Sequence, residues 1–375
     1  MIYLDNAATT MPIKEAIEIF DKINAEEYYN PSALYSCAFS LSQRINKARK
    51  TFLSILGDNN NQSQIIFTSG ATESNNIAIL GCPFNKNAKY LFSMGEHPSV
   101  YNCAVNLKMH GYNVEFIPLQ TNGQIDYDAL EKMCDSSVQF VSTMFVSNET
   151  GAINNLERIG NIVKSKSPKA IFHVDAVQGF CKLPLNVVKS KIDLCSLSAH
   201  KIGGLKGCGA LYIKNGINLK NIMYGGGQEF GLRSGTVNPA IILSFETSAK
   251  CAYEKMSANL EKVRIINKHF LSKISNFKNI TIVSSLDASP YIISLICEGN
   301  RGETIMRYLD SKGIIVGTGS ACSSQKVGNR VLENMKYTKN QILGCFRISF
   351  NPHNTIDEID LLVENLETYF NTINA

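Results

Sequence analysis

The feature that most constrains the fold is an alternation of short apolar runs with amphipathic stretches between residues 65 and 213. The runs have the length of strands, and the stretches between them have the apolar spacing of helices. Strands that alternate with helices favour a mainly parallel sheet with helices on both faces. The apolar runs are Ile65–Phe67, Tyr90–Phe92, Val114–Leu119, Val138–Val146, Ala170–Val174, Leu194–Leu197 and Ala210–Ile213. The sequence therefore predicts an α/β fold, in which ligands bind beyond the carboxyl ends of the strands.

A second region follows a long helical pattern that runs from Ile241 to Phe277. Beyond this pattern, further apolar runs predict strands, and the stretch Ile356–Phe370 predicts a closing amphipathic helix. The runs are Ile280–Ser284, Tyr291–Ile296, Ile314–Val316 and Arg347–Phe350. They indicate a smaller α/β unit, and the long helical pattern could bridge the two units.

Composition and charge exclude several classes of protein. The 375 residues are 44% hydrophobic and 18% charged, which is enough to bury a sizeable core and excludes a disordered or fibrous chain. The net charge is +5 and no block of about five like charges occurs, so direct binding of nucleic acid is not expected. No apolar run approaches the ~18 residues that cross a bilayer. Because residues 1–6 also lack the features of a signal peptide, we expect a cytoplasmic protein without a membrane partner.

The cysteines support the same location. Eleven cysteines without a secretion signal favour a reducing compartment, and an odd number cannot pair completely within the chain. None of them is spaced like the thiolate pairs of a structural zinc site, so no intrinsic metal site is expected. Most are predicted to be small buried apolar side chains.

Two segments that contain glycine are candidates for binding an anion. Residues 67–73 lie between a predicted strand and a predicted helix, where free N–H groups and the helix dipole favour a phosphate. An ordinary helix cap explains this segment equally well. In residues 224–236, Arg233, Ser234 and Thr236 add anion-binding groups to a triple glycine. The alternative there is a flexible surface turn.

Three side chains at the ends of predicted elements point to a cofactor. Lys201 follows a buried strand and is a candidate for a desolvated amine that forms Schiff bases, although most lysines are merely solvated. Asp175 also ends a strand, where it could instead cap a helix. A Schiff-base lysine and an aspartate opposite a pyridinium nitrogen are the pair that pyridoxal phosphate requires. His97 precedes a helix at Pro98 and could stack on a flat ring and exchange protons, although a lone histidine is usually structural.

Taken together, these motifs resemble the class V aminotransferase family of fold type I pyridoxal-phosphate enzymes, and within it the cysteine desulfurases of the NifS and IscS kind. The matching segments are residues 3–10, 30–32, 68–74, 96–97, 148–151, 174–178, 198–201, 225–236, 319–322 and 347–349. The resemblance implies a large cofactor-binding domain over residues 15–250, built on a mainly parallel seven-stranded sheet. It also implies a small α/β domain made of residues 1–14 and 251–375.

The resemblance assigns the cofactor ring to four residues. Lys201 would hold pyridoxal 5'-phosphate as a Schiff base and remove the Cα proton of the substrate. Asp175 would pair with the pyridinium nitrogen, and Gln178 with the phenolic oxygen. His97 would stack on the ring and shuttle protons.

The remaining implied contacts concern the phosphate and the substrate. The phosphate would be held by Ala71, Thr72, Ser198 and His200. Thr236 would reach the phosphate of the other subunit, so a homodimer is the expected assembly. The residues expected to contact the substrate are Asn30, Asn148 and Arg347, with Asn148 also touching the cofactor. The planar fork of Arg347 suits a substrate carboxylate.

Cys322 places the chain among the desulfurases. It lies in a stretch of small residues, 316–324, that suits a mobile loop with an exposed thiol. The resemblance implies that its thiolate takes sulfur from L-cysteine, releases alanine, and passes the persulfide sulfur to an acceptor. That acceptor would be an iron–sulfur scaffold protein or a tRNA thiolation enzyme. Cys322 could also transiently ligate an iron–sulfur cluster shared with such a partner.

Two other functions remain open at this stage. A selenocysteine lyase, or another class V lyase or aminotransferase, would use the same cofactor site. A non-catalytic binding partner would keep the fold, but it should have lost some of the chemical residues, all of which are present. The chain departs from the family pattern at Tyr29, Tyr35, Phe230 and Gln325, which could alter the entrance or the partner surface.

Overall fold

The computed structural model describes residues 1–59, 62–318 and 329–373. Its central layer is a seven-stranded sheet in the order β2-β8-β7-β6-β5-β3-β4. The strands are β2 (Gln64–Thr68), β3 (Lys89–Ser93), β4 (Asn113–Ile117), β5 (Val138–Met144), β6 (Ile171–Asp175), β7 (Leu194–Ser198) and β8 (Gly209–Ile213). Neighbours pair in parallel except at β8, which is antiparallel to both β2 and β7. Each strand overlaps one predicted apolar run, so the predicted mainly parallel sheet is confirmed.

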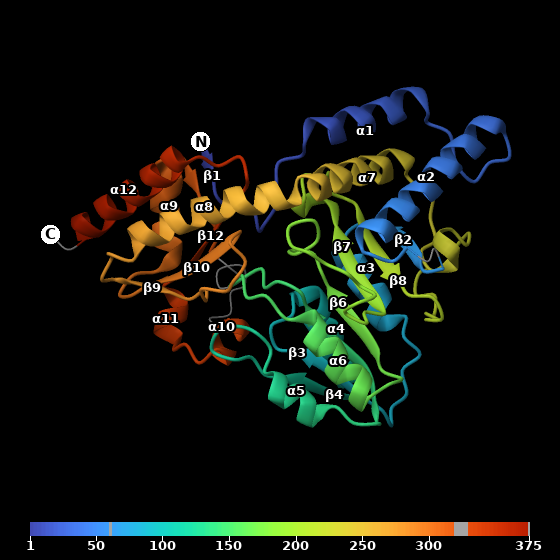
Figure 1. Ribbon diagram of the computed structural model, residues 1–375, viewed down its shortest axis with the longest axis horizontal. Helices are drawn as coiled ribbons and strands as arrows, with labels where there is room; N and C mark the ends of the chain where they lie inside the picture. Colours follow the sequence, from blue (N-terminus) through green and yellow to red (C-terminus); the bar gives the residue numbers. More distant parts are fainter. Residues whose placement is uncertain (60–61, 319–328, 374–375) are drawn as a thin grey trace.

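Two apolar cores lie on opposite faces of this sheet. Successive side chains of a strand point to opposite faces, so Ile66 of β2 joins one core and its neighbours Ile65 and Phe67 join the other. Helices α3 and α4 cover the first core, whereas α2, α6 and α7 cover the second (Figure 1). The helices of this region are α1 (Lys14–Glu26), α2 (Ser36–Ile55), α3 (Ala71–Leu80), α4 (Pro98–Met109), α5 (Tyr127–Met133), α6 (Leu156–Lys166) and α7 (Pro239–Glu254).

The carboxyl ends of the central strands meet at one edge of the sheet. Met144 at the end of β5 pairs with Asp175 at the end of β6, and Asp175 pairs with Ser196 of β7. Strand β7 then leads into the short 3-10 helix η1 (Ala199–Lys201). Because parallel strands end together, side chains that follow different strands in the sequence gather at this edge.

The second region contains two smaller sheets. One is antiparallel, in the order β12-β10-β9, and the other pairs β1 with β11 in parallel. Their strands are β1 (Ile2–Tyr3), β9 (Ile280–Ile282), β10 (Ile292–Cys297), β11 (Ile314–Ile315) and β12 (Cys345–Ser349). The accompanying helices are α8 (Met256–Ile274), α9 (Gly302–Ser311), α10 (Arg330–Asn334), α11 (Lys339–Leu343) and α12 (Ile356–Ile373). The four predicted strands and the closing helix are confirmed, and β1 brings the start of the chain beside its last third (Figure 1).

The predicted single helical stretch from Ile241 to Phe277 is wrong in one respect. The chain forms two helices, α7 and α8, which meet at Lys255. Lys255 has φ −92° and ψ 1°, outside the usual α-helical range, and its carbonyl accepts a hydrogen bond from Asn259 N–H. Neither glycine nor proline stands at the junction, and the periodic apolar pattern continues through it. The sequence therefore gives no sign of the break between the two helices.

Three expectations from the sequence concern the cysteines, intrinsic metal sites and membrane-spanning segments. Of the ten cysteines among the described residues, all except Cys37 and Cys251 are buried, and none forms a disulfide. No cluster of side chains that could hold a metal ion occurs within residues 1–59, 62–318 and 329–373. No helix in these same ranges is long and apolar enough to span a bilayer.

The aromatic contacts of α2 generate a stability prediction. Phe52 is fully buried, and its ring centroid lies 4.7 Å from that of Phe245 and 5.6 Å from that of Phe67. Phe52→Ala should lower the free energy of unfolding by about 3–5 kcal/mol, because it opens a cavity between α2, α7 and β2. Urea unfolding followed by circular dichroism measures this loss. Phe39 lies on the same helix but is exposed, so Phe39→Ala should change stability by less than about 0.5 kcal/mol. Equal losses for the two variants would contradict the packing described here.

Candidate active site

A cavity of about 520 Å³ opens at the carboxyl ends of the central strands. It brings together most of the candidate residues from distant parts of the sequence. Those that line it are Ala71, Thr72, His97, Asn148, Asp175, Gln178, Ser198, His200, Lys201 and Arg347. Asn30 and Thr236 are exposed and do not line it. Cys322 lies outside the described residues.

One end of the cavity is a cradle around the first turn of α3. Gly70 precedes the helix with φ 156°, and no side chain of the described chain caps the helix here. On the other side, β8 passes so closely that a Cβ on Gly209 would lie 2.7 Å from Gly70 Cα. The glycines thereby keep the backbone N–H groups of Ala71 and Thr72 next to the cavity. The first turn of α3 is suited to an anion such as a phosphate.

Asp175 is fixed in the cavity by two donors. Its Oδ2 accepts a 2.8 Å hydrogen bond from Asn75 Nδ2, and its Oδ1 accepts one of 3.1 Å from Val177 N–H. The side chain is buried and lines the cavity. A carboxylate held in this way has lone pairs left for a further donor inside the cavity.

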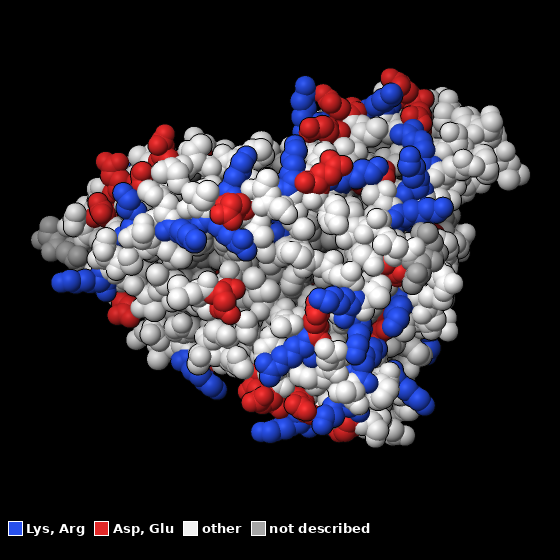
Figure 2. Space-filling view, in the orientation of Figure 1, with Lys and Arg blue, Asp and Glu red and all other residues white. Residues whose placement is uncertain are grey.

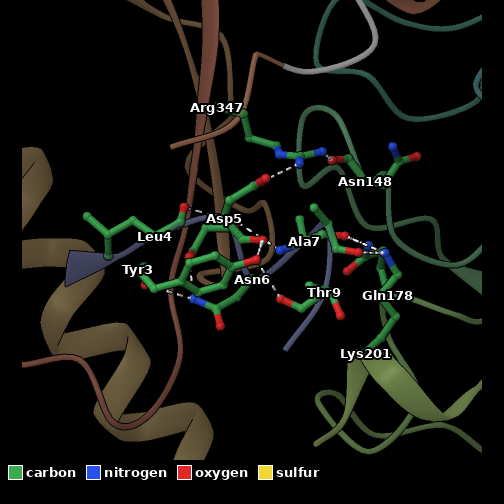
Figure 3. A network of polar contacts seen from close by, with 12 residues as sticks. Tyr3, Leu4, Asp5, Asn6, Ala7, Thr9, Asn148, Gln178, Lys201 and Arg347 are labelled. Carbon is green, nitrogen blue, oxygen red and sulfur yellow. Dashed lines mark hydrogen bonds and ion pairs between the residues drawn. The ribbon is translucent and has the colours of Figure 1, made fainter. Parts of the chain in front are cut away.

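Lys201 reaches the cavity from η1 and is held by the N-terminal segment. Its Nζ donates to the carbonyl oxygens of Ala7, at 2.6 Å, and Ala8, at 2.7 Å (Figure 3). Burial and the positive charge of Arg347 together lower its pKa to about 8, against the opposing charges of Asp5 and Asp175. A larger share of this amine is therefore uncharged near neutral pH than for an ordinary lysine.

Gln178 shares the same anchor and has a buried cation behind it. Its Nε2 donates to the Ala7 carbonyl at 2.8 Å, and its Oε1 accepts from Lys182 Nζ at 3.4 Å. Burial, followed by the charges of Lys201 and Arg347, lowers the pKa of Lys182 to about 7. Lys182 therefore orients the amide of Gln178 without lining the cavity itself.

Arg347 extends from β12 to the opposite wall of the cavity. Its Nη2 lies 2.7 Å from Asp5 Oδ1, and its Nη1 donates to the Asn148 carbonyl at 2.6 Å (Figure 3). The side chain is buried, yet its Nε has no partner within the described part of the chain. Of the five N–H donors of the guanidinium, the two contacts named use one each on Nη1 and Nη2, so donors remain for a ligand.

The two histidines of the site differ in their surroundings. His97 stands at the N-cap of α4, and Pro98 occupies the first turn as the sequence indicated. His200 Nδ1 lies 3.2 Å from Thr9 Oγ1, and burial together with the nearby Lys201 charge lowers the pKa of His200 to about 4. His200 is therefore neutral at physiological pH.

Two ion pairs hold the second glycine-containing segment, residues 224–236, in place. Arg233 pairs with Glu73 of α3 at 2.8 Å instead of facing a free anion site. Glu229 is buried and receives two 2.7 Å hydrogen bonds from Arg49. These ion pairs tie the segment to α2 and α3.

Several side chains of the site carried no signal that sequence reasoning could use. Asn75 follows the 68–74 motif directly, and Lys182 stands four residues after Gln178. Only the fold shows that these two side chains point toward the residues of the site. Asp5 belongs to a motif of the resemblance, but its pairing with Arg347 spans 342 positions.

On the face shown in Figure 2, acidic and basic side chains are interspersed rather than gathered by sign.

A family model, a curated relative and two solved structures each match nearly the full length of this chain. The Aminotransferase class-V family model matches residues 2–362. The cysteine desulfurase IscS of Clostridium botulinum is 33% identical over an alignment of 373 residues, which covers 97% of this chain and 93% of that protein. The solved structure of a NifS-like protein superposes with a TM-score of 0.92 at 31% identity, covering 99% of both chains. A structure of SspA in complex with cysteine has a TM-score of 0.83 at 28% identity, over 95% of this chain and 100% of the other.

The surroundings of Lys201 predict how its amine titrates. Reductive methylation of the cofactor-free protein at a series of pH values, read by mass spectrometry of the Lys201 peptide, should give a midpoint near 8. An ordinary lysine titrates near about 10.4. Arg347→Gln should move the midpoint upward, because it removes a positive charge and leaves the Asp5 carboxylate nearby. Arg307→Gln, at an exposed position of α9, should leave it unchanged. A wild-type midpoint near 10 would refute this electrostatic description.

Proposed function

Because the chain belongs to the class-V aminotransferase family and to its cysteine desulfurase group, we propose that it converts L-cysteine to L-alanine and carries the sulfur as a persulfide on Cys322. The observation that carries the proposal is the joint placement of Lys201, Asp175 and Arg347 around one cavity. An amine with a lowered pKa, a carboxylate and a guanidinium with spare donors are what amino-acid chemistry on a pyridine cofactor needs. Enzymes of this family use pyridoxal phosphate.

The residues present fit that cofactor. The uncapped first turn of α3 offers N–H groups to a phosphate, and Ser198 and His200 line the cavity nearby. Asp175 keeps lone pairs for a ring nitrogen, and Gln178 lies beside Lys201 on the same Ala7 anchor. When bound, the cofactor withdraws electrons from the substrate through its ring.

Three side chains of this chain then act on the substrate. Lys201, with its lowered pKa, is partly uncharged at neutral pH and so can accept the Cα proton at Nζ. Arg347 would hold the substrate carboxylate with the N–H donors that its contacts to Asn148 and Asp5 leave unused, and its ion pair with Asp5 fixes the direction of the fork. His97 lines the cavity at the start of α4 and is placed to exchange a proton.

The described residues on either side of Cys322 support its part in this proposal. The backbone of Gly317, five residues before Cys322, pairs with that of Arg347, which lines the cavity, through 2.9 Å and 2.7 Å hydrogen bonds. On the other side, Asn329 donates to Glu149 Oε2 at 2.5 Å, and Glu149 follows Asn148, which also lines the cavity.

The sulfur transfer is a displacement at sulfur. The Cys322 thiolate attacks the substrate sulfur, and an S–S bond forms as the Cβ–S bond breaks. The electron pair of the broken bond stays with the carbon, which takes up a proton and leaves as alanine. A second displacement by an acceptor thiol regenerates the enzyme.

The wider setting is also a proposal. We infer a homodimer in which Thr236 and Asn30, both exposed here, complete the partner's site. We infer a sulfur acceptor of the iron–sulfur scaffold or tRNA thiolation class, and a reducing, cytoplasmic compartment that suits the unpaired cysteines. We place the boundary between a large and a small domain near Lys255, with the first 14 residues belonging to the small one.

Release of sulfide and alanine from L-cysteine tests the function. In the presence of a thiol reductant, the two products should form in equal amounts. Lys201→Ala and Cys322→Ala should each reduce release by at least about a thousandfold, because one removes the base and the other the nucleophile. The matched control is Cys37→Ala, which removes an exposed thiol and should leave turnover unchanged.

The outcomes separate the alternatives. Undiminished cysteine turnover in Cys322→Ala would contradict the persulfide mechanism. Selenocysteine turnover that survives in this variant, while cysteine turnover is lost in it, would leave the proposed role of Cys322 intact. A wild-type protein that binds the cofactor but releases neither alanine nor sulfide would refute the proposed activity.

A further inference from the structure

A chain of four side chains connects the two polar ends of the cavity. It starts at Asp175 on β6, passes through Asn75 on α3 and Ser99 on α4, and ends at His97. The three links are each 2.8 Å long, from Asp175 Oδ2 to Asn75 Nδ2, from Asn75 Nδ2 to Ser99 Oγ, and from Ser99 Oγ to His97 Nδ1. Asn75 is fully buried.

The direction of each hydrogen bond follows from the donor inventory. An ionised carboxylate only accepts, so the amide of Asn75 must present its NH₂ group to Asp175. The same NH₂ group donates its second proton to Ser99 Oγ. The opposite orientation of the amide would place Asn75 Oδ1 against the carboxylate, and in the described chain Oδ1 has no hydrogen-bond partner.

At the last link, the backbone settles which atom donates. Ser99 N–H points at His97 Nδ1 from 3.2 Å, and this bond is the side-chain cap of α4. A backbone N–H cannot reverse its direction, so Nδ1 carries a lone pair rather than a proton. The Ser99 hydroxyl, having accepted from Asn75, has its own proton free to donate to the same nitrogen. In the neutral ring the proton is then on Nε2.

We propose that Asn75 and Ser99 are positioning residues that hold His97 in the neutral tautomer with its proton on Nε2, so that His97 presents Nε2–H to a bound substrate as a hydrogen-bond donor. The donor role rests on the proposed function, whereas the tautomer does not. The lone pair of the neutral ring is on Nδ1 and already accepts from Ser99. The ring therefore offers the substrate an N–H group rather than a lone pair.

The charges around the imidazole agree with a neutral ring. Burial lowers the pKa of His97, and Lys201 of η1 and Arg330 of α10 lower it further. Asp175 of β6 and Glu149 of the turn after β5 act in the opposite direction. Two donors at Nδ1 add to the lowering, because an imidazolium has no lone pair to accept them.

Nitrogen NMR of the full chain with ¹⁵N-labelled histidine tests the tautomer directly. Two-bond correlations between the ring nitrogens and ring protons distinguish Nδ1–H from Nε2–H, and His97→Gln assigns one signal among the six histidines. We expect the Nε2–H pattern in the protein with and without pyridoxal phosphate. An Nδ1–H pattern would overturn the proposal.

Variants of the two positioning residues test the cause. Ser99→Ala should raise the pKa of His97 by about half a unit to one unit, because one of the two donors is lost. Ser99→Thr keeps a hydroxyl and should restore the wild-type titration. Asn75→Asp should raise the pKa of His97 more, since a second carboxylate would draw the Ser99 hydroxyl away from Nδ1.

The control lies next to Asn75 on the same helix. Asn76 donates back to the Thr72 carbonyl, so Asn76→Ala should leave the His97 titration unchanged. Equal titration of His97 in wild type, Ser99→Ala and Asn75→Asp would overturn the positioning role. An Nε2–H pattern that shifts as expected, in a protein that releases no sulfide, would refute the proposed function and support the tautomer assignment.

Discussion

The docking of the N-terminal segment between the two regions is the contact on which the site depends. Asp5 pairs with Arg347 of β12, whereas two residues later the Ala7 carbonyl receives both Lys201 and Gln178 (Figure 3). The segment is held from behind as well, since Ser349 Oγ accepts from Ala7 N–H at 2.8 Å. Removing one member of a buried ion pair leaves the other charge without compensation, which costs several kcal/mol. A few residues at the start of the chain thus orient side chains from both regions of the molecule, Lys201 and Gln178 from the first and Arg347 from the second.

A concentration of positive charge is the electrostatic consequence of this arrangement. Besides burial, the charges of Lys201 and Arg347 lower the pKa of Lys182, and the charge of Arg347 lowers the pKa of Lys201, where Asp5 and Asp175 act in the opposite direction. Like charges at close range raise the free energy of the cavity unless an anion enters it. A substrate carboxylate and a phosphate each bring negative charge, so their binding relieves the repulsion. Burial, together with the charge of Arg347, keeps part of the Lys201 population uncharged and able to accept a proton.

The sequence predicted the elements of the fold better than their junctions. Apolar runs identified the strands of the central sheet because burial on both faces demands continuous apolar residues. The break at Lys255 escaped because the apolar period continues across it, and no residue there opposes a helix. In the site, Lys201, Asp175 and His97 were recognisable because each follows a strand or starts a helix. Lys182 was not recognisable in the sequence. Its ammonium group lies over the ring of Tyr291 in the second region, and the two residues are 109 positions apart in the sequence.

The direction of hydrogen bonds is a further property that residue types alone do not determine. Serine and asparagine can both donate and accept, so Asn75 and Ser99 are compatible with either tautomer of His97 until their neighbours are known. The ionised Asp175 breaks this symmetry at one end, and the fixed N–H of Ser99 breaks it at the other. The carboxylate that would face the ring nitrogen of a cofactor therefore also sets the direction of the chain that ends at His97.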